Sequence, residues 1–337
     1  MTRQQIIYNP AEPSIGVAPY MQDILAAEFD LVPWQPRCRT NGFSPVDSAV
    51  LTVYQTAETD SQPWYHAMEQ NGCQIIVDHL LDSDVHSVST STDRHLTLRN
   101  GRWMWYSTSL RYTLAGFGQY RPQRCRDRDF LMMMNKSRPH RDRVLEQLAP
   151  LLDNALYSYV DRGIDISESD SRQSHRDLHW YDYFNPAWYD RTGFSVVVES
   201  WMRSDAYFAN PGEPEPNALV RLRPNYRTEV SEKIFKPLAF QHPFIVYGSE
   251  GTLRYLQALG FETFDNLWDE AYDLITSDSA RFDAVTAIVK SAVAQPLTLD
   301  PLTEQKLQHN RERFWDQPLV TDLVRREIIH DIQEFLS

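Results

Sequence analysis

The sequence predicts an α/β fold in which a doubly wound parallel sheet is covered by helices on both faces. Residues 130–134 form a fully apolar run of strand length, and residues 194–199 have the composition of a second buried strand that ends in a carboxylate. An amphipathic segment of helical length follows the first run, and such alternation is typical of α/β sheets. At 337 residues the chain is long enough for two domains with separate cores.

The amino-terminal part, up to about residue 126, alternates short apolar runs with turn formers. This pattern predicts a mixed α/β domain that includes a strand over residues 74–78. Asn100 followed by Gly101 separates two β-rich runs within residues 95–106, a pattern that predicts a β-hairpin. A cluster of four arginines then marks a boundary or a basic rim: Arg121, Arg124, Arg126 and Arg128.

The next part has the strand and helix rhythm of a parallel sheet. A helix is expected to begin at Ser137 as its N-cap, with Pro139 in the first turn, and to continue through Leu152. Residues 155–160 are the next expected strand. Residues 164–191 are polar and aromatic without periodicity, and loops of this length are often functional.

The remaining elements follow the same alternation. A helix over residues 229–240 precedes a strand over 243–247, and a helix over 250–259 ends at Gly260 as its C-terminal cap. Three more helices are predicted, over residues 280–294, 302–314 and 319–336. The last has a continuous apolar face, so we expect it to pack on a domain.

Composition excludes several classes of protein. The net charge of −13 argues against a large nucleic-acid interface, because phosphate binding depends on clustered Lys and Arg. The three cysteines, Cys38, Cys73 and Cys125, are far apart and predict neither a disulfide framework nor a zinc site. Without a signal-peptide core or a run of membrane-spanning length, the sequence predicts a soluble cytoplasmic protein, in the host cytoplasm if the protein is viral.

Three groups of polar residues fall where ligands bind in an open α/β sheet, beyond the carboxyl ends of the strands. One is Glu199, and another is Glu232 with Lys233 at the start of a helix. The third concentrates positive charge at a strand to helix junction, as a diphosphate would need: Asn135, Lys136, Arg138, His140 and Arg141. Each has an ordinary alternative, as a solvated first turn, a strand-end carboxylate or a surface ion pair.

Common catalytic signatures are missing from the sequence. It contains no glycine-rich phosphate loop, no Gly-x-Ser-x-Gly elbow and no His-Glu-x-x-His motif. A phosphate site in this chain would therefore depend on side chains.

The strand that ends in Glu199, the Ser231-Glu232-Lys233 helix start and the Pro-Phe-Ile-Val-Tyr-Gly strand ending at Gly248 resemble the donor-binding half of α-1,3-fucosyltransferase-like glycosyltransferases. That family has Phe-x-x-x-x-Glu-Asn, then Tyr-Val-Thr-Glu-Lys, then a Val-Pro-Val strand. The resemblance covers residues 130–293. Within it, residues 253–273 are similar to uncharacterised viral and marine microbial proteins of this kind.

The resemblance implies the GT-B arrangement: two Rossmann-like domains face each other across a cleft, and carboxyl-terminal helices cross between them. Residues 1–126 would be the acceptor-side domain, residues 127–300 the nucleotide-sugar domain, and residues 301–337 the helices that pack back. The activity implied is a metal-independent, inverting hexosyl transfer from a GDP- or UDP-sugar to a glycan or another hydroxyl-bearing acceptor, with no cofactor. Ser231 and Ser200 stand where the family has Thr and Asn, so the donor sugar can differ from fucose.

The family's residue roles carry over to matching positions. Glu232 would bind the ribose or the sugar, Lys233 and Arg138 the diphosphate, and Glu199 the sugar ring. A carboxylate of the amino-terminal domain would be the general base; Asp78, at the end of a predicted strand, is the candidate. The rivals for that role are His79, Asp82 and Asp84.

Two other readings of the sequence stay open. The chain can be a non-catalytic protein that binds a nucleotide sugar or a glycan with the same fold. It can also be a transferase that modifies nucleic acid, for which the arginine cluster at residues 121–128 is the one indication. The sequence does not indicate an oligomeric state.

Overall fold

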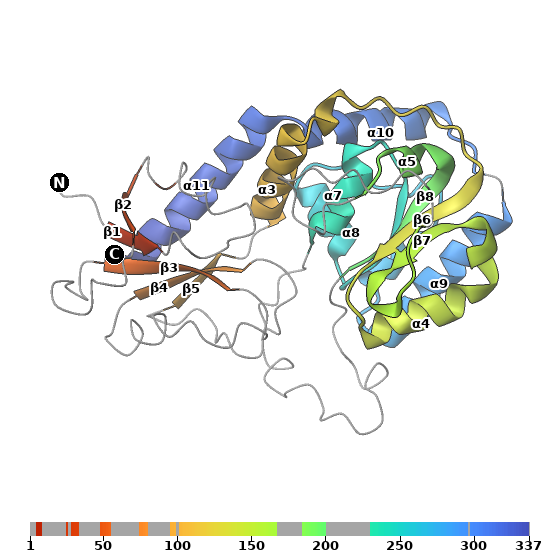
Figure 1. The fold of residues 1–337 in the computed structure, drawn as a ribbon, viewed down its shortest axis with the longest axis horizontal. Coiled ribbons are helices and arrows are strands. Elements are labelled where there is room, and N and C mark those ends of the chain that lie inside the picture. Colours follow the sequence, from red (N-terminus) through yellow and green to blue (C-terminus); the bar gives the residue numbers. More distant parts are fainter. Residues whose placement is uncertain are drawn as a thin grey trace, which may run out of the picture. The chain divides into compact units, whose positions relative to one another are not determined.

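The computed structural model describes residues 5–8, 25, 28–33, 48–54, 74–79, 95–98, 101–166, 184–199, 230–295 and 297–336 (Figure 1). The chain divides into two compact units. The first, here called the amino-terminal unit, comprises Met1–Ser107 and Pro318–Ser337; the second, the central unit, comprises Thr108–Gln317. The boundaries that the sequence suggests at residues 126 and 300 stay predictions.

The amino-terminal unit contains a parallel sheet. All four pairings between its five described strands are parallel. Across the sheet the strands are β2 (Asp30–Pro33), β1 (Gln5–Tyr8), β3 (Ser48–Tyr54), β4 (Gln74–His79) and β5 (His95–Leu98). The predicted strand at residues 74–78 is thus confirmed as part of β4.

The predicted hairpin at residues 95–106 is wrong. β5 pairs in parallel with β4, and helix α3 (Gly101–Leu114) begins where the second hairpin strand was expected. The spacing of the buried residues in this segment gives the physical reason. Trp105, Thr108, Ser109 and Tyr112 are all buried, and their i, i+3, i+4, i+7 pattern is that of one helix face. Tertiary burial of this face outweighs the local β propensity of the aromatic run.

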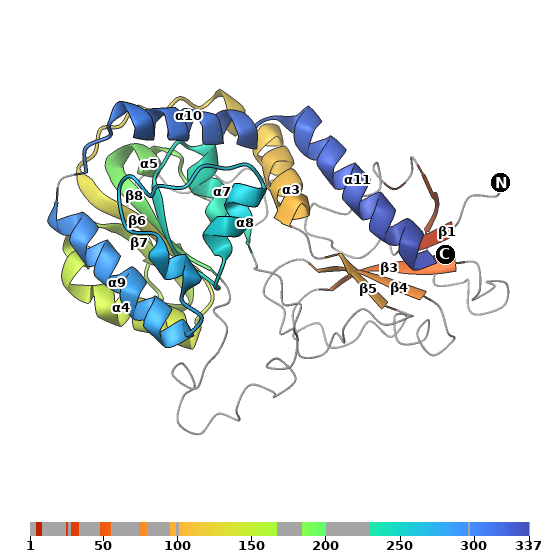
Figure 2. The ribbon, with the colours of Figure 1, turned by 180° about the vertical axis from the view of Figure 1, so that it is seen from behind.

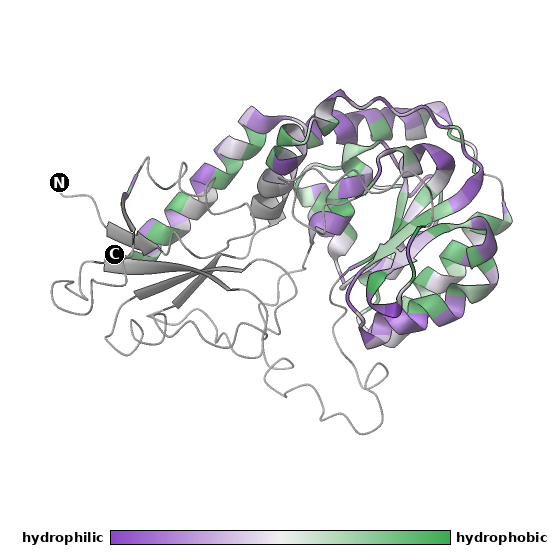
Figure 3. Cartoon of the chain, viewed as in Figure 1, coloured by the Kyte–Doolittle hydropathy of each residue, from purple (hydrophilic) through white to green (hydrophobic). Residues whose placement is uncertain are grey.

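A second parallel sheet forms the core of the central unit. Its strands, in order, are β7 (Leu156–Tyr159), β6 (Arg128–Met134), β8 (Thr192–Val198) and β9 (Phe244–Tyr247). Every residue of β8 and β9 is buried, which is why their side chains are apolar apart from Thr192 and Ser195. Figure 3 shows these central strands as predominantly hydrophobic. The predicted α/β fold with a parallel sheet is confirmed.

Helices cover this sheet. Figures 1 and 2 show α4 and α9 together on one side, with α7 and α10 on the other. The α-helices that follow α3 in the central unit are α4 (Pro139–Leu148), α5 (Ala187–Arg191), α7 (Glu232–Ala239), α8 (Thr252–Ala258), α9 (Asp278–Ala294) and α10 (Pro301–Phe314). Helix α11 (Gln317–Leu336) belongs, from Pro318 on, to the amino-terminal unit. Short 3-10 turns are η1 (Phe117–Gln119), η2 (Ala149–Asn154), η3 (Val160–Arg162) and η5 (Ala271–Leu274).

Two predicted helix ends can be compared with the structure. The N-cap of α4 is Arg138, without a side-chain cap, so the predicted Ser137 cap is wrong; the backbone N–H of Ser137 instead donates to Asp161 (2.9 Å). Gly260 does end α8, with a φ of 83° and its N–H bonded to the carbonyl of Gln257 (2.8 Å). A positive φ suits glycine, and this prediction is confirmed.

Aromatic rings fill the space between the end of α3, η1, α7 and α10. The ring of Tyr112 lies 5.5 Å from that of Phe117, 5.6 Å from Phe184, 6.2 Å from Phe240 and 6.0 Å from Phe314, measured between centroids. These contacts join segments that are about 200 residues apart in sequence, so they hold the central unit together around one apolar core.

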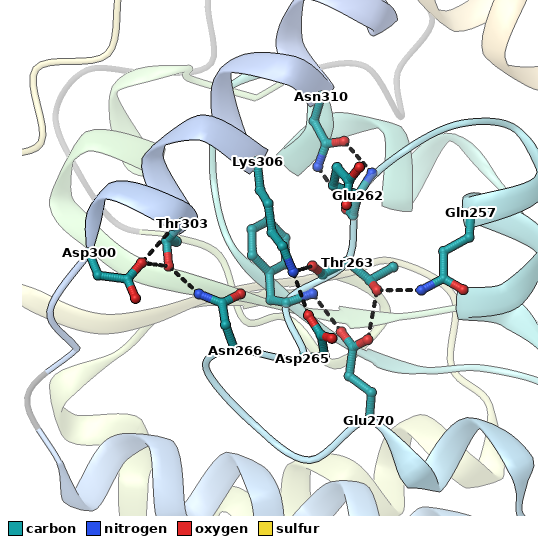
Figure 4. Close-up of polar contacts among 11 residues, drawn as sticks. Gln257, Glu262, Thr263, Asp265, Asn266, Glu270, Asp300, Thr303, Lys306 and Asn310 are labelled. Carbon is teal, nitrogen blue, oxygen red and sulfur yellow. Dashed lines mark hydrogen bonds and ion pairs between the residues drawn. The ribbon is translucent and has the colours of Figure 1, made fainter.

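Side chains of α10 form hydrogen bonds with the segment that follows α8, as Figure 4 shows. The side-chain amide of Asn310 accepts from the N–H of Glu262 (2.7 Å) and donates to its carbonyl (2.8 Å). Lys306 donates to the carbonyl of Thr263 (2.8 Å) and pairs with Asp265. The irregular segment thus finds its backbone partners on a helix surface.

Basic residues of α10 also cap two helices that end beside it. Arg311 donates to the carbonyl of Ala239 (2.8 Å), the last residue of α7. Arg313 donates to the carbonyl of Leu259 (2.6 Å), directly after α8. Cations at these positions complement the negative ends of the helix dipoles and satisfy carbonyls that lack helical partners.

Candidate functional site

The order of the central sheet locates a ligand-binding edge. From β6 the chain runs to β7 on one side and then to β8 on the other, so the connections reverse direction between β6 and β8. In open α/β sheets, ligands bind at this switch point, beyond the carboxyl ends of the strands. The β6–β8 register pairs Leu131 with Ser195, and its continuation places Asn135 level with Glu199. Both predicted residues therefore lie at the switch point.

Glu199 ties the end of β8 to the start of α7. Its N–H continues the ladder to β9 by donating to the carbonyl of Tyr247 (3.0 Å). Its buried carboxylate accepts from the N–H of Ser231 (3.2 Å) and from the Ser231 hydroxyl. Two residues that are 32 positions apart thus form one polar junction.

Burial raises the pKa of the Glu199 carboxyl above its usual range, against the opposing effects of Lys233 and of the hydrogen bonds from Ser231. The neighbouring charge of Glu232 raises the pKa further. Glu199 therefore holds a proton at a higher pH than an ordinary glutamate, which is typical of carboxyl groups in functional sites as well as of buried structural ones.

Glu232 and Lys233 form an ion pair at the start of α7, with 3.1 Å between Lys233 Nζ and Glu232 Oε1. Only 4% of the Glu232 side chain and 13% of the Lys233 side chain are exposed. Ser231 is the N-cap of the helix, and its hydroxyl lies 3.4 Å from Lys233 Nζ. Ser231, Glu232, Lys233 and Glu199 are thus brought together, with most of their surface turned inward.

The polar and basic residues that follow β6 differ in burial. His140 and Arg141 are buried: the ring Nε2 of His140 lies 3.0 Å from the carbonyl of Glu199, and Arg141 donates to the carbonyl of Lys136 (2.9 Å). Asn135, Lys136 and Arg138 are partly exposed. His140 joins the first turn of α4 to the end of β8, so the two walls of the candidate site share a direct contact.

Carboxylates that the sequence does not single out occupy two helix starts at this edge. Before α4, Asp161 accepts the N–H of Ser137, and Asp142 accepts from the hydroxyl of Tyr159 (2.7 Å). At α8, the buried Asp273 accepts from the N–H groups of Leu253 (2.9 Å) and Arg254 (3.1 Å). Of these carboxylates, Asp273 takes the position that an anionic ligand would use at a helix N-terminus.

Asp78, the predicted general base, lies in β4 of the amino-terminal unit. Its backbone is in register with Val53 of β3 and Leu98 of β5. It therefore belongs to a different unit from Glu199, and its role as the base stays a prediction. Of the rival bases, His79 ends β4, whereas Asp82 and Asp84 lie outside the described residues.

The arginine segment between α3 and β6 is engaged in contacts within the central unit. Arg124 pairs with Glu304, Arg126 donates to the carbonyl of Leu297 (3.0 Å), and Arg128 to that of Asp127 (3.0 Å). These contacts explain the arginines as anchors of an extended connection. Of these three contacts, the Arg124–Glu304 pair offsets positive charge that a nucleic-acid partner would require.

Comparison of the sequence with models of known protein families gives no match, and comparison with curated proteins gives none either. Within the described parts of the chain, no group of three or more His, Cys, Asp or Glu side chains is arranged to hold a metal ion. No described helix combines the length and the apolar composition that crossing a bilayer requires.

Proposed function

We propose that this protein is a glycosyltransferase that moves a sugar from a nucleotide-diphosphate sugar to an acceptor hydroxyl. The proposal includes the GT-B arrangement, with the donor on the central unit and the acceptor on the amino-terminal unit. One observation carries it: Glu199, Ser231, Glu232, Lys233 and His140 converge at the switch point of a parallel sheet. This is the edge at which α/β folds bind nucleotides.

The chemistry of the proposed reaction follows from the residue types. The acceptor oxygen attacks the anomeric carbon as the bond from that carbon to the diphosphate breaks, so the configuration inverts. The acceptor proton passes to a carboxylate, for which Asp78 is proposed. Lys233 and Arg138 would balance the charge that develops on the leaving nucleoside diphosphate, the task that a metal ion performs in other transferases.

The carboxylates would orient the donor. In this proposal Glu232 binds a hydroxyl of the ribose or of the sugar, and Glu199 contacts the sugar ring. Both carboxylates are nearly buried and held by neighbours, Glu232 by Lys233 and Glu199 by Ser231. Side chains fixed in this way lose little rotamer freedom when a ligand binds, which favours precise orientation. Asn135, Lys136 and Arg138 supply the partly exposed rim beside them.

Calorimetry with a panel of GDP- and UDP-sugars tests donor binding. Lys233→Ala should weaken binding of the matching donor by about tenfold or more, because removal of a charged contact costs roughly 1.5–3 kcal/mol. Lys290→Ala, which changes an exposed lysine on α9, is the matched control and should bind normally. If no donor binds the wild-type protein, or if Lys233→Ala binds as tightly, the proposal fails.

Transfer assays separate the enzyme from the alternative, a non-catalytic protein that binds a nucleotide sugar or a glycan. The enzyme should release nucleoside diphosphate in the presence of a glycan acceptor, and Asp78→Asn should abolish release while donor binding persists. Donor binding without release, across a broad panel of acceptors, would favour the binding protein.

A further inference from the structure

The sheet of the amino-terminal unit has a strand order that locates a ligand-binding edge of its own. From β1 the chain runs to β2 on one side and then to β3 on the other, and β4 and β5 follow outward from β3. The pairings between these strands are parallel. The connections therefore reverse direction between β1 and β3. In α/β sheets of this strand order, ligands bind at that switch point, beyond the carboxyl ends of the strands.

The strand register brings three residues together at this edge. β3 continues beyond the level at which β1 ends, because Tyr8, the last residue of β1, is level with Leu51. Tyr54, the last residue of β3, is level with His79, the last residue of β4, and Asp78 directly precedes His79. The backbones of Tyr54, Asp78 and His79 thus lie side by side at the carboxyl edge, next to the switch point.

These three residue types favour a neutral ligand that carries many hydroxyl groups. An aspartate carboxylate accepts hydrogen bonds from hydroxyl groups, and a neutral histidine ring donates one hydrogen bond and accepts another. A tyrosine combines a flat apolar ring, which suits the apolar face of a sugar, with a hydroxyl group at its tip. A carboxylate at the same edge would repel a phosphate or another anion. The residue types therefore indicate a saccharide rather than a phosphorylated ligand.

The charge of the surrounding sequence supports the same class of ligand. Residues 1–107 contain twelve Asp and Glu residues against six arginines and no lysine. Every lysine of the chain lies in the central unit. Ligands rich in phosphate are bound through clustered Lys and Arg, so the composition argues against nucleic acid or another polyanion at this edge. A neutral ligand meets no such repulsion.

We propose that the carboxyl edge of β3 and β4 binds a neutral saccharide through Tyr54, Asp78 and His79. The inference rests on the proposed function in one respect: the saccharide would be the acceptor whose hydroxyl group passes its proton to Asp78. Recognition of the saccharide needs no nucleotide sugar. Tyr54 and His79 then determine which acceptor binds, and Asp78 contacts the hydroxyl group that reacts.

Binding of the full chain to an array of immobilised neutral and anionic oligosaccharides, without any nucleotide sugar, tests the site. At least one neutral saccharide should bind, and calorimetry with that saccharide in solution gives its Kd. Binding to none of them, or to the anionic ones alone, would overturn the inference. Titration of the same preparation with GDP- and UDP-sugars tests the transferase separately. Donor binding without saccharide binding refutes only the saccharide site, and saccharide binding without donor binding refutes only the transferase.

Variants at the two ends of the same strands separate the site from a general effect on the sheet. Tyr54→Ala should raise the Kd for the saccharide about tenfold, whereas Tyr54→Phe, which keeps the ring, should retain most of the affinity. His79→Ala should also weaken binding. Gln74→Ala, at the amino end of β4, is the matched control and should bind normally. Unchanged affinity in both Tyr54→Ala and His79→Ala, or an equal loss in Gln74→Ala, would overturn the inference.

Discussion

His242 is a neutral histidine locked inside the central unit. Its Nε2 lies 2.9 Å from the carbonyl of Thr192, which can only accept, so Nε2 carries the proton. Nδ1 then accepts from the hydroxyl of Ser195 (2.8 Å). Both ring nitrogens are satisfied in the neutral form. A second proton would have to displace the Ser195 hydrogen bond in a buried position.

Lowering the pH should therefore reduce the free energy of unfolding, because His242 is buried in its neutral form. Burial, with a smaller effect from Arg126 and Arg124, lowers the pKa of His242 from 6.5 to about 3. Between these values the unfolded chain binds a proton that the folded chain does not, so the free energy of unfolding falls as the pH falls through this window. The slope is on the order of 1 kcal/mol per pH unit. Urea unfolding at pH 7, 6, 5 and 4 measures it.

His242→Gln is the informative variant, because glutamine keeps one donor and one acceptor but does not titrate. Its unfolding free energy should change less between pH 6 and pH 4 than that of the wild-type protein. Buried carboxyl groups with a raised pKa, such as Glu199 and Asp273, act in the opposite direction and are common to both proteins. Identical slopes in the two proteins would contradict the assignment.

At the scale of elements, α10 supplies backbone partners to an irregular segment. Asn310 is 1% exposed and makes both hydrogen bonds to Glu262. Asn310→Ala should lower the free energy of unfolding by about 2 kcal/mol, because a polar pair loses its partner while water reaches it only in part. Gln305→Ala, on an exposed position of the same helix, is the control. Equal unfolding free energies of the two variants would show that the Asn310 contacts contribute nothing.

The sequence predicts those elements whose buried residues are consecutive in the chain. Residues 130–134 and 244–247 are apolar throughout, and residues 194–198 are apolar except for Ser195, so the sequence shows these buried strands directly. The sequence does not predict α3, because the buried face of this helix includes the polar residues Thr108 and Ser109. They interrupt the apolar spacing by which an amphipathic helix is recognised. Only contacts made elsewhere in the fold reveal that face.

The candidate site divides in the same way. Glu199, Ser231, Glu232 and Lys233 lie at element ends that a pattern of strands and helices can locate. Asp161 and Asp273 could not be found, since each accepts a backbone N–H that lies about 20 residues earlier in the chain, just before α4 for Asp161 and at the start of α8 for Asp273. An isolated aspartate in a loop gives no sign of which helix it will meet. The burial of the Glu232 side chain could not be predicted either, because it depends on the packing of α7.

At the scale of the whole molecule, the chain begins and ends in the same unit. Residues Pro318–Ser337, nearly all of α11, group with Met1–Ser107 rather than with the central unit that precedes them. Among the side chains of this helix that the structure describes, Val320, Val324, Ile329 and Ile332 are buried. The amino-terminal unit is therefore complete only after the last helix has been made.

Damage to α11 should consequently appear in the amino-terminal unit. Val324→Asp places an unpaired charge at a fully buried position and should cost that unit on the order of 3 kcal/mol. Hydrogen exchange should show lost protection in β3 and β4 and normal protection in β6 and β8. Arg325→Asp places the same carboxylate at an exposed neighbour and should leave both units protected. Equal loss in both sheets, or in neither, would contradict the division into units.

The buried carboxyl group of Glu199 has a consequence for any anion that binds beside it. A negative ligand would raise the pKa of Glu199 further, so binding at a pH where Glu199 is partly ionised would be accompanied by proton uptake from the buffer. The heat of binding would then vary with the ionisation enthalpy of the buffer, and the same titration in MES and in imidazole would give different values. In Glu199→Gln the two heats should coincide. Glu199 would thus report on occupancy of the site through the protons that it exchanges with the solvent.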